Sequence, residues 1–229
     1  MTDSKKPKLG AITIGQSPRT DVVQEMLPFL GKDVEVIQAG ALDGLEYQEI
    51  LKFKPEEGDY VLVSTLRDGR SVKFAEKHIL PRLQLCIDKL EDEGAQIILF
   101  ICTGTFPDVF HSKKPVLYPQ KIMHSSVPNL TSASKIGIVI PDKEQIAQTV
   151  LKWKEAGMDA VVVPFSPYTG EDEMEPIANV LKDADIDLIV MDCIGYTLSM
   201  KRQLTRLTEK SVVLARTFVA RVLGELLDD

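Results

Sequence analysis

The sequence lacks the features that mark several large classes of protein. Only three of its 229 residues are cysteine, namely Cys86, Cys102 and Cys193, and no two of them form a Cys-x-x-Cys pair. Neither a disulfide scaffold nor a zinc site is indicated, and reduced thiols are expected. The three histidines also lack metal-ligand spacing, so we expect no metal.

Long apolar runs and an excess of basic residues are also missing. No run approaches the roughly 20 apolar residues that a membrane helix needs, and the first residues show no secretory pattern. We therefore expect a cytoplasmic protein without a membrane partner. The 27 basic residues are outnumbered by 34 acidic ones, and the formal net charge of −7 argues against binding nucleic acid. The expected partner is a small anionic or polar metabolite.

Glycine-rich nucleotide motifs are absent, since neither GxGxxG nor GxxxxGK[ST] occurs. The chain instead alternates short apolar runs with helical patterns. Strands that are hydrophobic on both faces and separated by helices indicate parallel sheets covered by helices, an α/β fold with right-handed crossovers. We expect strands at 9–14, 34–38, 60–64, 96–101, 135–140, 160–164, 188–191 and 212–214, and helices at 18–30, 77–93, 119–127, 143–156, 172–182, 197–208 and 217–227.

The alternation is interrupted between residues 107 and 134, where proline, serine and lysine are frequent. It restarts at Lys135 as if a second unit began, so we expect two lobes. We place residues 1–106 and 211–229 in the first lobe and residues 107–210 in the second. In open α/β sheets ligands bind at the carboxyl ends of the strands, so the residues that follow each strand are the candidates for a site.

Two of the expected strands end in similar motifs that contain a cysteine. LFICTGTF, residues 99–106, and IVMDCIGYT, residues 189–197, each run from an apolar strand into Cys, one further residue and Gly. Cys102 and Cys193 therefore lie at corresponding strand ends in the two halves, and both thiols can face one cleft. A thiolate and a thiol on opposite sides of a carbon acid can exchange the roles of base and acid without a cofactor.

This chemistry requires the thiol pKa to fall from about 8.5 toward neutral. We expect helix N–H groups after Gly104 and Gly195 to lower it, and both glycines to allow close approach of the backbone. Asp192 would raise the pKa of the neighbouring Cys193 unless its carboxylate points away. Hydrogen bonds to a substrate carboxylate or a developing enolate are expected from the hydroxyl residues of the two motifs, Thr103, Thr105, Tyr196 and Thr197.

Taken singly, a cysteine is more often a small core residue than a reagent. Cys86 illustrates this, because it continues an apolar stripe at helical spacing with Ile79, Leu83 and Leu90. The shared Cys-x-Gly context is what favours a functional role for the other two cysteines.

Two further strand ends carry arginine. IGQSPRTD, residues 14–21, follows the first strand with a turn at Gly15, a candidate helix cap at Ser17, and Arg19. STLRDGRS, residues 64–71, follows the third strand and contains Arg67. We expect Ser17, Arg19 and Arg67 to hold the anionic end of a substrate. The alternatives are an ordinary N-cap and a hairpin with a surface arginine.

These motifs resemble those of the AroM family, a set of bacterial proteins within the aspartate/glutamate racemase superfamily. The likeness covers essentially the full length, and it is carried by IGQSPRTD, GALDGL (40–45), LVSTLRDG (62–69) and ICTGTFP (101–107). Within the superfamily, the two Cys-x-Gly contexts are similar to those of hydantoin racemase. The resemblance implies two flavodoxin-like lobes related by a pseudo-twofold axis, a cleft between them and no cofactor.

Our first functional hypothesis is a cofactor-independent racemase or isomerase that acts on a small carboxylate or cyclic amide through Cys102 and Cys193. Glutamate racemases carry an acidic residue with Ser after the first strand and Thr directly after the second cysteine, whereas this sequence has Gln16-Ser17 and Ile194. Two alternatives therefore stay open: a decarboxylase or cis-trans isomerase with one working cysteine, and a non-catalytic metabolite-binding protein. The sequence leaves both a monomer and a homodimer open.

Overall fold

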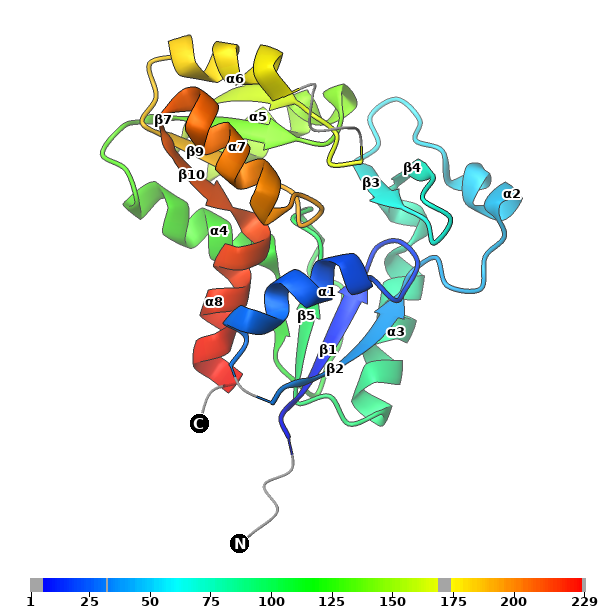
Figure 1. The fold of residues 1–229 in the computed structure, drawn as a ribbon. Coiled ribbons are helices and arrows are strands. Elements are labelled where there is room, and N and C mark those ends of the chain that lie inside the picture. The colour runs from blue at the N-terminus through cyan, green and yellow to red at the C-terminus, as the bar shows by residue number, and fades with distance from the viewer. Residues whose placement is uncertain (1–5, 32, 169–173, 228–229) are drawn as a thin grey trace, which may run out of the picture.

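The computed structural model describes residues 6–31, 33–168 and 174–227. Figure 1 shows an α/β protein of two lobes. Its strands are β1 (Lys8–Thr13), β2 (Glu35–Gly40), β3 (Val61–Thr65), β4 (Ser71–Ala75), β5 (Ile97–Phe100), β6 (Val116–Leu117), β7 (Lys135–Ile140), β8 (Asp159–Pro164), β9 (Leu188–Met191) and β10 (Ser211–Leu214). Its α-helices are α1 (Thr20–Met26), α2 (Tyr47–Ile50), α3 (Leu80–Asp92), α4 (Pro119–Ser126), α5 (Ile146–Glu155), α6 (Met174–Asp183), α7 (Leu198–Thr208) and α8 (Ala215–Leu227).

Each lobe is built on a parallel sheet. Over the described residues the first sheet has the strand order β2-β1-β5-β6 and the second has the order β8-β7-β9-β10. When the strands of each sheet are renumbered along the chain, both orders become 2-1-3-4, the beginning of the flavodoxin-like order. The α/β class and the two-lobe fold are therefore confirmed, and β5 and β9 are equivalent strands.

The two lobes share a hydrophobic core. Its buried side chains include Leu99 of β5, Val190 of β9 and Val219 of α8. Figure 1 shows α8 close to α1 and α4, in agreement with the contacts between these helices. Because α8 packs against elements from both halves, it holds the two sheets in a defined relation. Cys86 lies on the buried face of α3, in a core cluster of the first lobe, as its helical spacing predicts.

The sheets differ from the predicted lobe boundaries at two short strands. We expected residues 211–229 in the first lobe, but β10 pairs with β9 at an edge of the second sheet. We expected residues 107–210 in the second lobe, but β6 pairs with β5 in the first sheet. In both cases a parallel strand is added beside the strand that ends in a cysteine motif. Such pairing joins residues far apart in the chain, which sequence periodicity does not register.

The third predicted strand is also placed differently. β3 pairs antiparallel with β4 in a two-stranded hairpin and does not join either parallel sheet. The turn contains Gly69, whose φ of +85° is the left-handed conformation that glycine adopts readily, and Asp68 accepts a hydrogen bond from the Arg70 N–H at 3.0 Å. The Asp68-Gly69 turn therefore leads to a hairpin here, in place of the strand-helix alternation expected elsewhere in the chain.

The first helix is not capped in the predicted way. α1 begins at Thr20 with Arg19 at the N-cap and no side-chain capping hydrogen bond, so Ser17 does not cap it as expected. The predicted helix over 172–182 is described from Met174 onward, and its first two residues lie outside the described residues.

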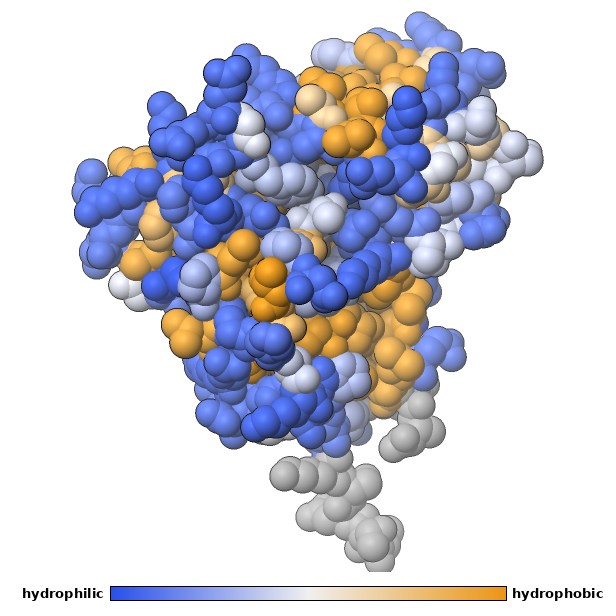
Figure 2. Space-filling model, turned by 180° about the vertical axis from the view of Figure 1, so that it is seen from behind, coloured by the Kyte–Doolittle hydropathy of each residue, from blue (hydrophilic) through white to orange (hydrophobic). Residues whose placement is uncertain are grey.

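The surface is mainly hydrophilic on the face that Figure 2 shows, with patches of hydrophobic residues between the charged ones. Exposed large hydrophobic residues include Val222 and Leu226 on α8. In the part of the chain that the structure describes, every helix is too short or too polar to cross a membrane. The choice between a monomer and a homodimer stays open.

Candidate active site

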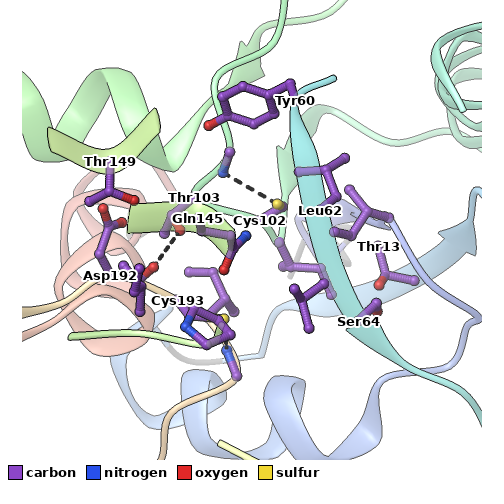
Figure 3. A pocket seen from close by; sticks show the side chains of 18 of the residues that line it. Thr13, Tyr60, Leu62, Ser64, Cys102, Thr103, Gln145, Thr149, Asp192 and Cys193 are labelled. Atoms are coloured by element: carbon purple, nitrogen blue, oxygen red, sulfur yellow. Dashed lines mark hydrogen bonds between the residues drawn. The ribbon is translucent and has the colours of Figure 1, made fainter. Parts of the chain in front are cut away.

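A pocket lies where the carboxyl ends of the two sheets face each other. Cys102 follows β5, Cys193 follows β9, and Figure 3 shows both side chains at this pocket. Cys102 and Cys193 are half-buried residues, whereas Cys86 is buried. The space open to the centre of a water molecule is about 40 Å³. That space holds roughly three waters, so the pocket suits a small ligand.

The two cysteine turns have the same local geometry. The Gly104 N–H donates to Cys102 Sγ at 3.3 Å, and the Gly195 N–H donates to Cys193 Sγ at 3.3 Å. A Cβ atom at either glycine would lie 3.4 Å from the sulfur of its own turn and 3.0 Å from a third residue, Leu62 or Pro167. The expected close approach of the backbone at both glycines is therefore present.

The thiol pKa values do not fall as the sequence led us to expect. Burial raises the pKa of Cys102 to about 12, against the Gly104 N–H and the positive charge of Lys152. Burial also raises the pKa of Cys193, although the Gly195 N–H, Arg19 and Arg216 oppose the rise. A thiolate loses its hydration in this small pocket, and one N–H donor does not compensate for that loss.

The raised pKa predicts an unusual pH dependence for Cys102. Alkylation by iodoacetamide requires the thiolate, so the rate at Cys102 should rise about tenfold per pH unit from pH 7 to 10, without a plateau. Site-resolved mass spectrometry of the alkylated peptides measures this rate. A plateau below pH 9 would show that the thiol ionises near its ordinary pKa and would contradict the assigned burial effect.

Arg19 and Thr103 are the predicted side chains that line the pocket together with the two cysteines. The Arg19 guanidinium is buried and donates to both carboxylate oxygens of Asp21, at 2.9 and 2.7 Å. Burial lowers the pKa of Arg19, but Asp21 and Tyr168 outweigh that effect, so the guanidinium stays charged. Thr103 Oγ1 donates to the Asp192 carbonyl at 2.9 Å and so links the two cysteine turns.

Ser17 and Arg67 lie outside this pocket, and both bind Asp43. The Asp43 carboxylate accepts hydrogen bonds from Ser17 N at 2.8 Å, Ser17 Oγ at 2.5 Å, Gly40 N at 2.9 Å and Arg67 Nη2 at 2.8 Å. Arg67 Nε also donates to the Ser17 carbonyl. The IGQSPRTD, GALDGL and LVSTLRDG motifs thus converge on one carboxylate that ties the hairpin turn to the loops after β1 and β2. Ser17 and Arg67 thus brace these loops outside the pocket, and their expected role in substrate binding stays a prediction.

Replacing Asp43 with alanine should lower the free energy of unfolding by about 2–4 kcal/mol, because several partly buried donors lose their acceptor. Urea denaturation measures this loss. Asp68→Ala, in the hairpin turn that Asp43 contacts through Arg67, is the matched control, since the Asp68 carboxylate is exposed and pairs with Arg70 only. Equal losses in the two variants would contradict the bracing role of Asp43.

The remaining predicted hydroxyl residues also have structural partners. Tyr196 is buried and donates to the Phe165 carbonyl at 2.6 Å, and Thr197 accepts from Met200 N at 3.2 Å as the N-cap of α7. The Thr105 N–H donates to Tyr60 Oη at 3.0 Å. None of these three residues lines the pocket, whereas Gly104 and Gly195 do. The second cysteine turn is therefore followed by the N-cap of α7. The hydroxyl groups of Tyr196 and Thr197 are both hydrogen-bonded to the backbone.

Sequence reasoning missed the residues that enclose the pocket from the side. Most of them lie in the hairpin and α5 or directly before these elements: Tyr60, Leu62, Ser64, Gln145, Gln148, Thr149 and Lys152. Figure 3 labels Tyr60, Leu62, Ser64, Gln145 and Thr149. Val61 of β3 donates to Gln148 Oε1 at 2.9 Å, and its carbonyl accepts from Gln145 Nε2 at 3.0 Å and Gln148 Nε2 at 2.9 Å. The hairpin of the first lobe is thereby fixed to a helix of the second.

Gln145 presents an acceptor to the pocket. Its Nε2 group is held by the Val61 carbonyl, which fixes the orientation of the amide. Its Oε1 atom is buried and accepts no hydrogen bond from the described residues. A buried acceptor without a partner is costly, so a ligand that donates an N–H or O–H to this oxygen would gain from it.

Asp192 is turned away from the neighbouring thiol. Its carboxylate accepts from Lys152 Nζ at 2.7 Å and from Trp153 Nε1 at 2.9 Å, both on α5. The Asp192 charge still raises the pKa of Cys193, as anticipated, although Lys152 balances part of that charge. Over the described residues, no cluster of three or more histidine, cysteine, aspartate or glutamate side chains could hold a metal ion.

The fold is shared with solved structures of a racemase, an isomerase and a decarboxylase. The chain superposes on an aspartate racemase from Picrophilus torridus with a TM-score of 0.65 at 12% identity, covering 96% of this chain and 94% of that one. It superposes on a maleate isomerase from Pseudomonas putida S16 with a TM-score of 0.60 at 15% identity, covering 97% of this chain and 92% of that one. On an arylmalonate decarboxylase the TM-score is 0.60 at 13% identity, with 95% of this chain and 92% of that one covered. At these identities the likeness establishes the fold alone.

The family of the chain follows from its sequence. The model of the family described as AroM protein matches residues 9–227, so the chain belongs to the AroM family. A sequence comparison with curated proteins gives no match.

Proposed function

We propose that the protein is a cofactor-independent racemase or isomerase in which Cys102 and Cys193 exchange a proton with the carbon of a small substrate. The observation that carries the proposal is the placement of two half-buried cysteines, one from each lobe, at one pocket with matching N–H donors. A substrate carbon between the thiols would have one proton acceptor and one proton donor on opposite faces, as inversion requires.

Either thiol can take either role, but the two are not equivalent in the free protein. Arg19 and Arg216 favour the thiolate of Cys193, whereas burial holds the pKa of Cys102 at about 12. We therefore assign the base in the first half-reaction to Cys193 and the acid to the thiol of Cys102. The reverse reaction requires the opposite assignment.

The lining of the pocket favours a small substrate with one anionic group and one N–H or O–H group. Arg19 lines the pocket and acts on Cys193, so it can hold a carboxylate or an enolate, although Asp21 already balances part of its charge. Gln145 Oε1 provides the acceptor. A small amino- or amide-bearing acid, or a cyclic amide, matches both groups. We expect it to be a cytoplasmic metabolite.

The high pKa of Cys102 favours one alternative within the same fold, a decarboxylase or isomerase in which only one cysteine works. A thiol that stays protonated at neutral pH can donate a proton to a carbanion without first acting as a base. A protein that only binds a metabolite would keep the pocket and need neither thiol.

A screen of small acids, hydantoins and aromatic-pathway intermediates tests the proposal. A substrate should protect Cys102 and Cys193 from alkylation and exchange its α-hydrogen with deuterated water, as followed by NMR and mass spectrometry. Protection without exchange, together with thermal stabilisation that persists in the double alanine variant, would instead identify a binding protein.

A further inference from the structure

The side chain of Lys152 connects the two cysteine turns. Among the described residues, no other side-chain cation does so. Its Nζ atom pairs with Asp192 Oδ2 at 2.7 Å and donates to the Thr103 carbonyl at 3.3 Å. Thr103 directly follows Cys102, and Asp192 directly precedes Cys193. One ammonium group therefore contacts both turns.

The burial of Lys152 is unusual for a lysine. It is 9% exposed, and the Asp192 side chain is 2% exposed. Burial lowers the pKa of Lys152, but Asp192 outweighs that effect and raises it, so the side chain stays charged. Lysines are almost never buried unless they are paired. Lys154, two residues further along α5, is exposed, which is the ordinary position for a helical lysine.

A buried ion pair is weak evidence for stability, because well-packed apolar residues often replace such a pair without loss. The position of Lys152 suggests a different role. It lines the pocket, and its positive charge acts on Cys102 and on Tyr60. Cys193 has Arg19 and Arg216 as nearby cations, whereas Lys152 is the cation that acts on Cys102.

We propose that Lys152 is a positioning residue that fixes the two cysteine turns relative to each other. Its positive charge also favours formation of the Cys102 thiolate. The inference rests on the proposed two-thiol function, because only a reaction in which both cysteines serve in turn as the base requires a cation beside each. It gives Lys152 no contact with the reacting carbon.

The charged and titratable groups that act on Cys102 are Lys152, Asp192, Cys193 and Tyr60. The His124 ring contacts the Trp153 ring in a tilted arrangement at a centroid distance of 4.6 Å, and burial lowers the pKa of His124 to about 4. It is therefore neutral between pH 7 and 9. Removing Lys152 leaves the negative groups at Cys102 without a balancing charge.

The test measures iodoacetamide alkylation at each cysteine by mass spectrometry between pH 7.5 and 9.5, without any ligand. In Lys152→Met the rate at Cys102 should fall about tenfold, equivalent to one pKa unit. The rate at Cys193, read in the same sample, should change much less. Lys152→Arg should restore the rate at Cys102, and Lys154→Met should leave both rates unchanged.

A second pair of variants keeps the test valid if Lys152→Met does not fold. Asp192→Asn leaves Lys152 without its counter-charge and should speed alkylation of Cys102. Lys152→Met combined with Asp192→Asn removes both charges, so its Cys102 should react about tenfold more slowly than in Asp192→Asn alone. Circular dichroism and thermal melting confirm the fold of each variant.

Equal rates at Cys102 in Asp192→Asn and in the double variant would overturn the proposal. An equal fall at both cysteines in Lys152→Met would do the same, since it would indicate a general change in the pocket. Because alkylation needs no substrate, this result is independent of the substrate screen. If no compound exchanges its α-hydrogen while Cys102 still depends on Lys152, the proposed reaction fails and the electrostatic role of Lys152 stands.

Discussion

Replacing either Cys102 or Cys193 with alanine is expected to reduce the exchange of a substrate α-hydrogen with deuterated water by about 10²–10⁴-fold, the usual contribution of a positioned acid or base. The two thiols approach the pocket from different lobes, so neither can take over the other's face of the carbon. The measurement is NMR detection of deuterium at the α-carbon, with both enantiomers of the substrate supplied separately.

Cys86→Ala is the matched control, because Cys86 is buried in the core of the first lobe and does not line the pocket. Its exchange rate should stay close to that of the unmodified protein. A loss of exchange in only one of the two pocket variants would favour the single-cysteine decarboxylase or isomerase. Full exchange in both variants would exclude cysteine acid-base chemistry.

Arg216→Met is expected to lower the free energy of unfolding by about 2–4 kcal/mol, because it leaves the half-buried Glu25 carboxylate and two backbone carbonyls without their donor. The Arg216 side chain is 1% exposed, pairs with Glu25 at 2.8 Å, and donates to the carbonyls of Ile194 and Gly195 at 2.8 and 3.0 Å. It thus joins α8, α1 and the turn after Cys193. For a protein of this size the melting temperature should fall by roughly 10 °C.

Arg221→Met on the same helix is the control for Arg216→Met. Arg221 is exposed and stacks over the Phe29 ring, so its removal should cost much less. The double variant Arg216→Met with Glu25→Met should recover only part of the loss: no charge is then left unpaired, but the Leu198 N–H, which donates to Glu25 at 3.1 Å, also loses its acceptor. Urea denaturation of the four proteins decides. A loss in Arg216→Met no larger than in Arg221→Met would show that the buried pair does not stabilise the Cys193 turn.

The local sequence predicted the elements that depend on local pattern. The apolar runs before Cys102 and Cys193 are both buried parallel strands, and the following glycines both place an N–H on the sulfur. These features repeat because each motif must end a strand and turn within a few residues. The equivalence of the two halves can therefore be recognised from the sequence alone.

The pairing of distant residues cannot be recognised in the same way. Lys152 and Asp192 are 40 positions apart, and a lysine in an amphipathic helix ordinarily predicts a solvated face. Arg67 follows a strand, as a binding arginine would, yet a turn at Gly69 directs it to Asp43. Thiol pKa values depend on how much of the surrounding pocket excludes water, which only the packing of the two lobes and the hairpin determines.

The proposed chemistry depends on Cys102 and Cys193 facing one ligand between the lobes. The most direct measurement is the dependence of alkylation at each cysteine on the concentration of a compound that undergoes exchange. The compound should protect both thiols from alkylation, with the same concentration giving half-maximal protection at each. In unfolded control samples, Cys86 should be alkylated whether or not the compound is present. Protection of one thiol while the other reacts at its ligand-free rate would contradict this placement.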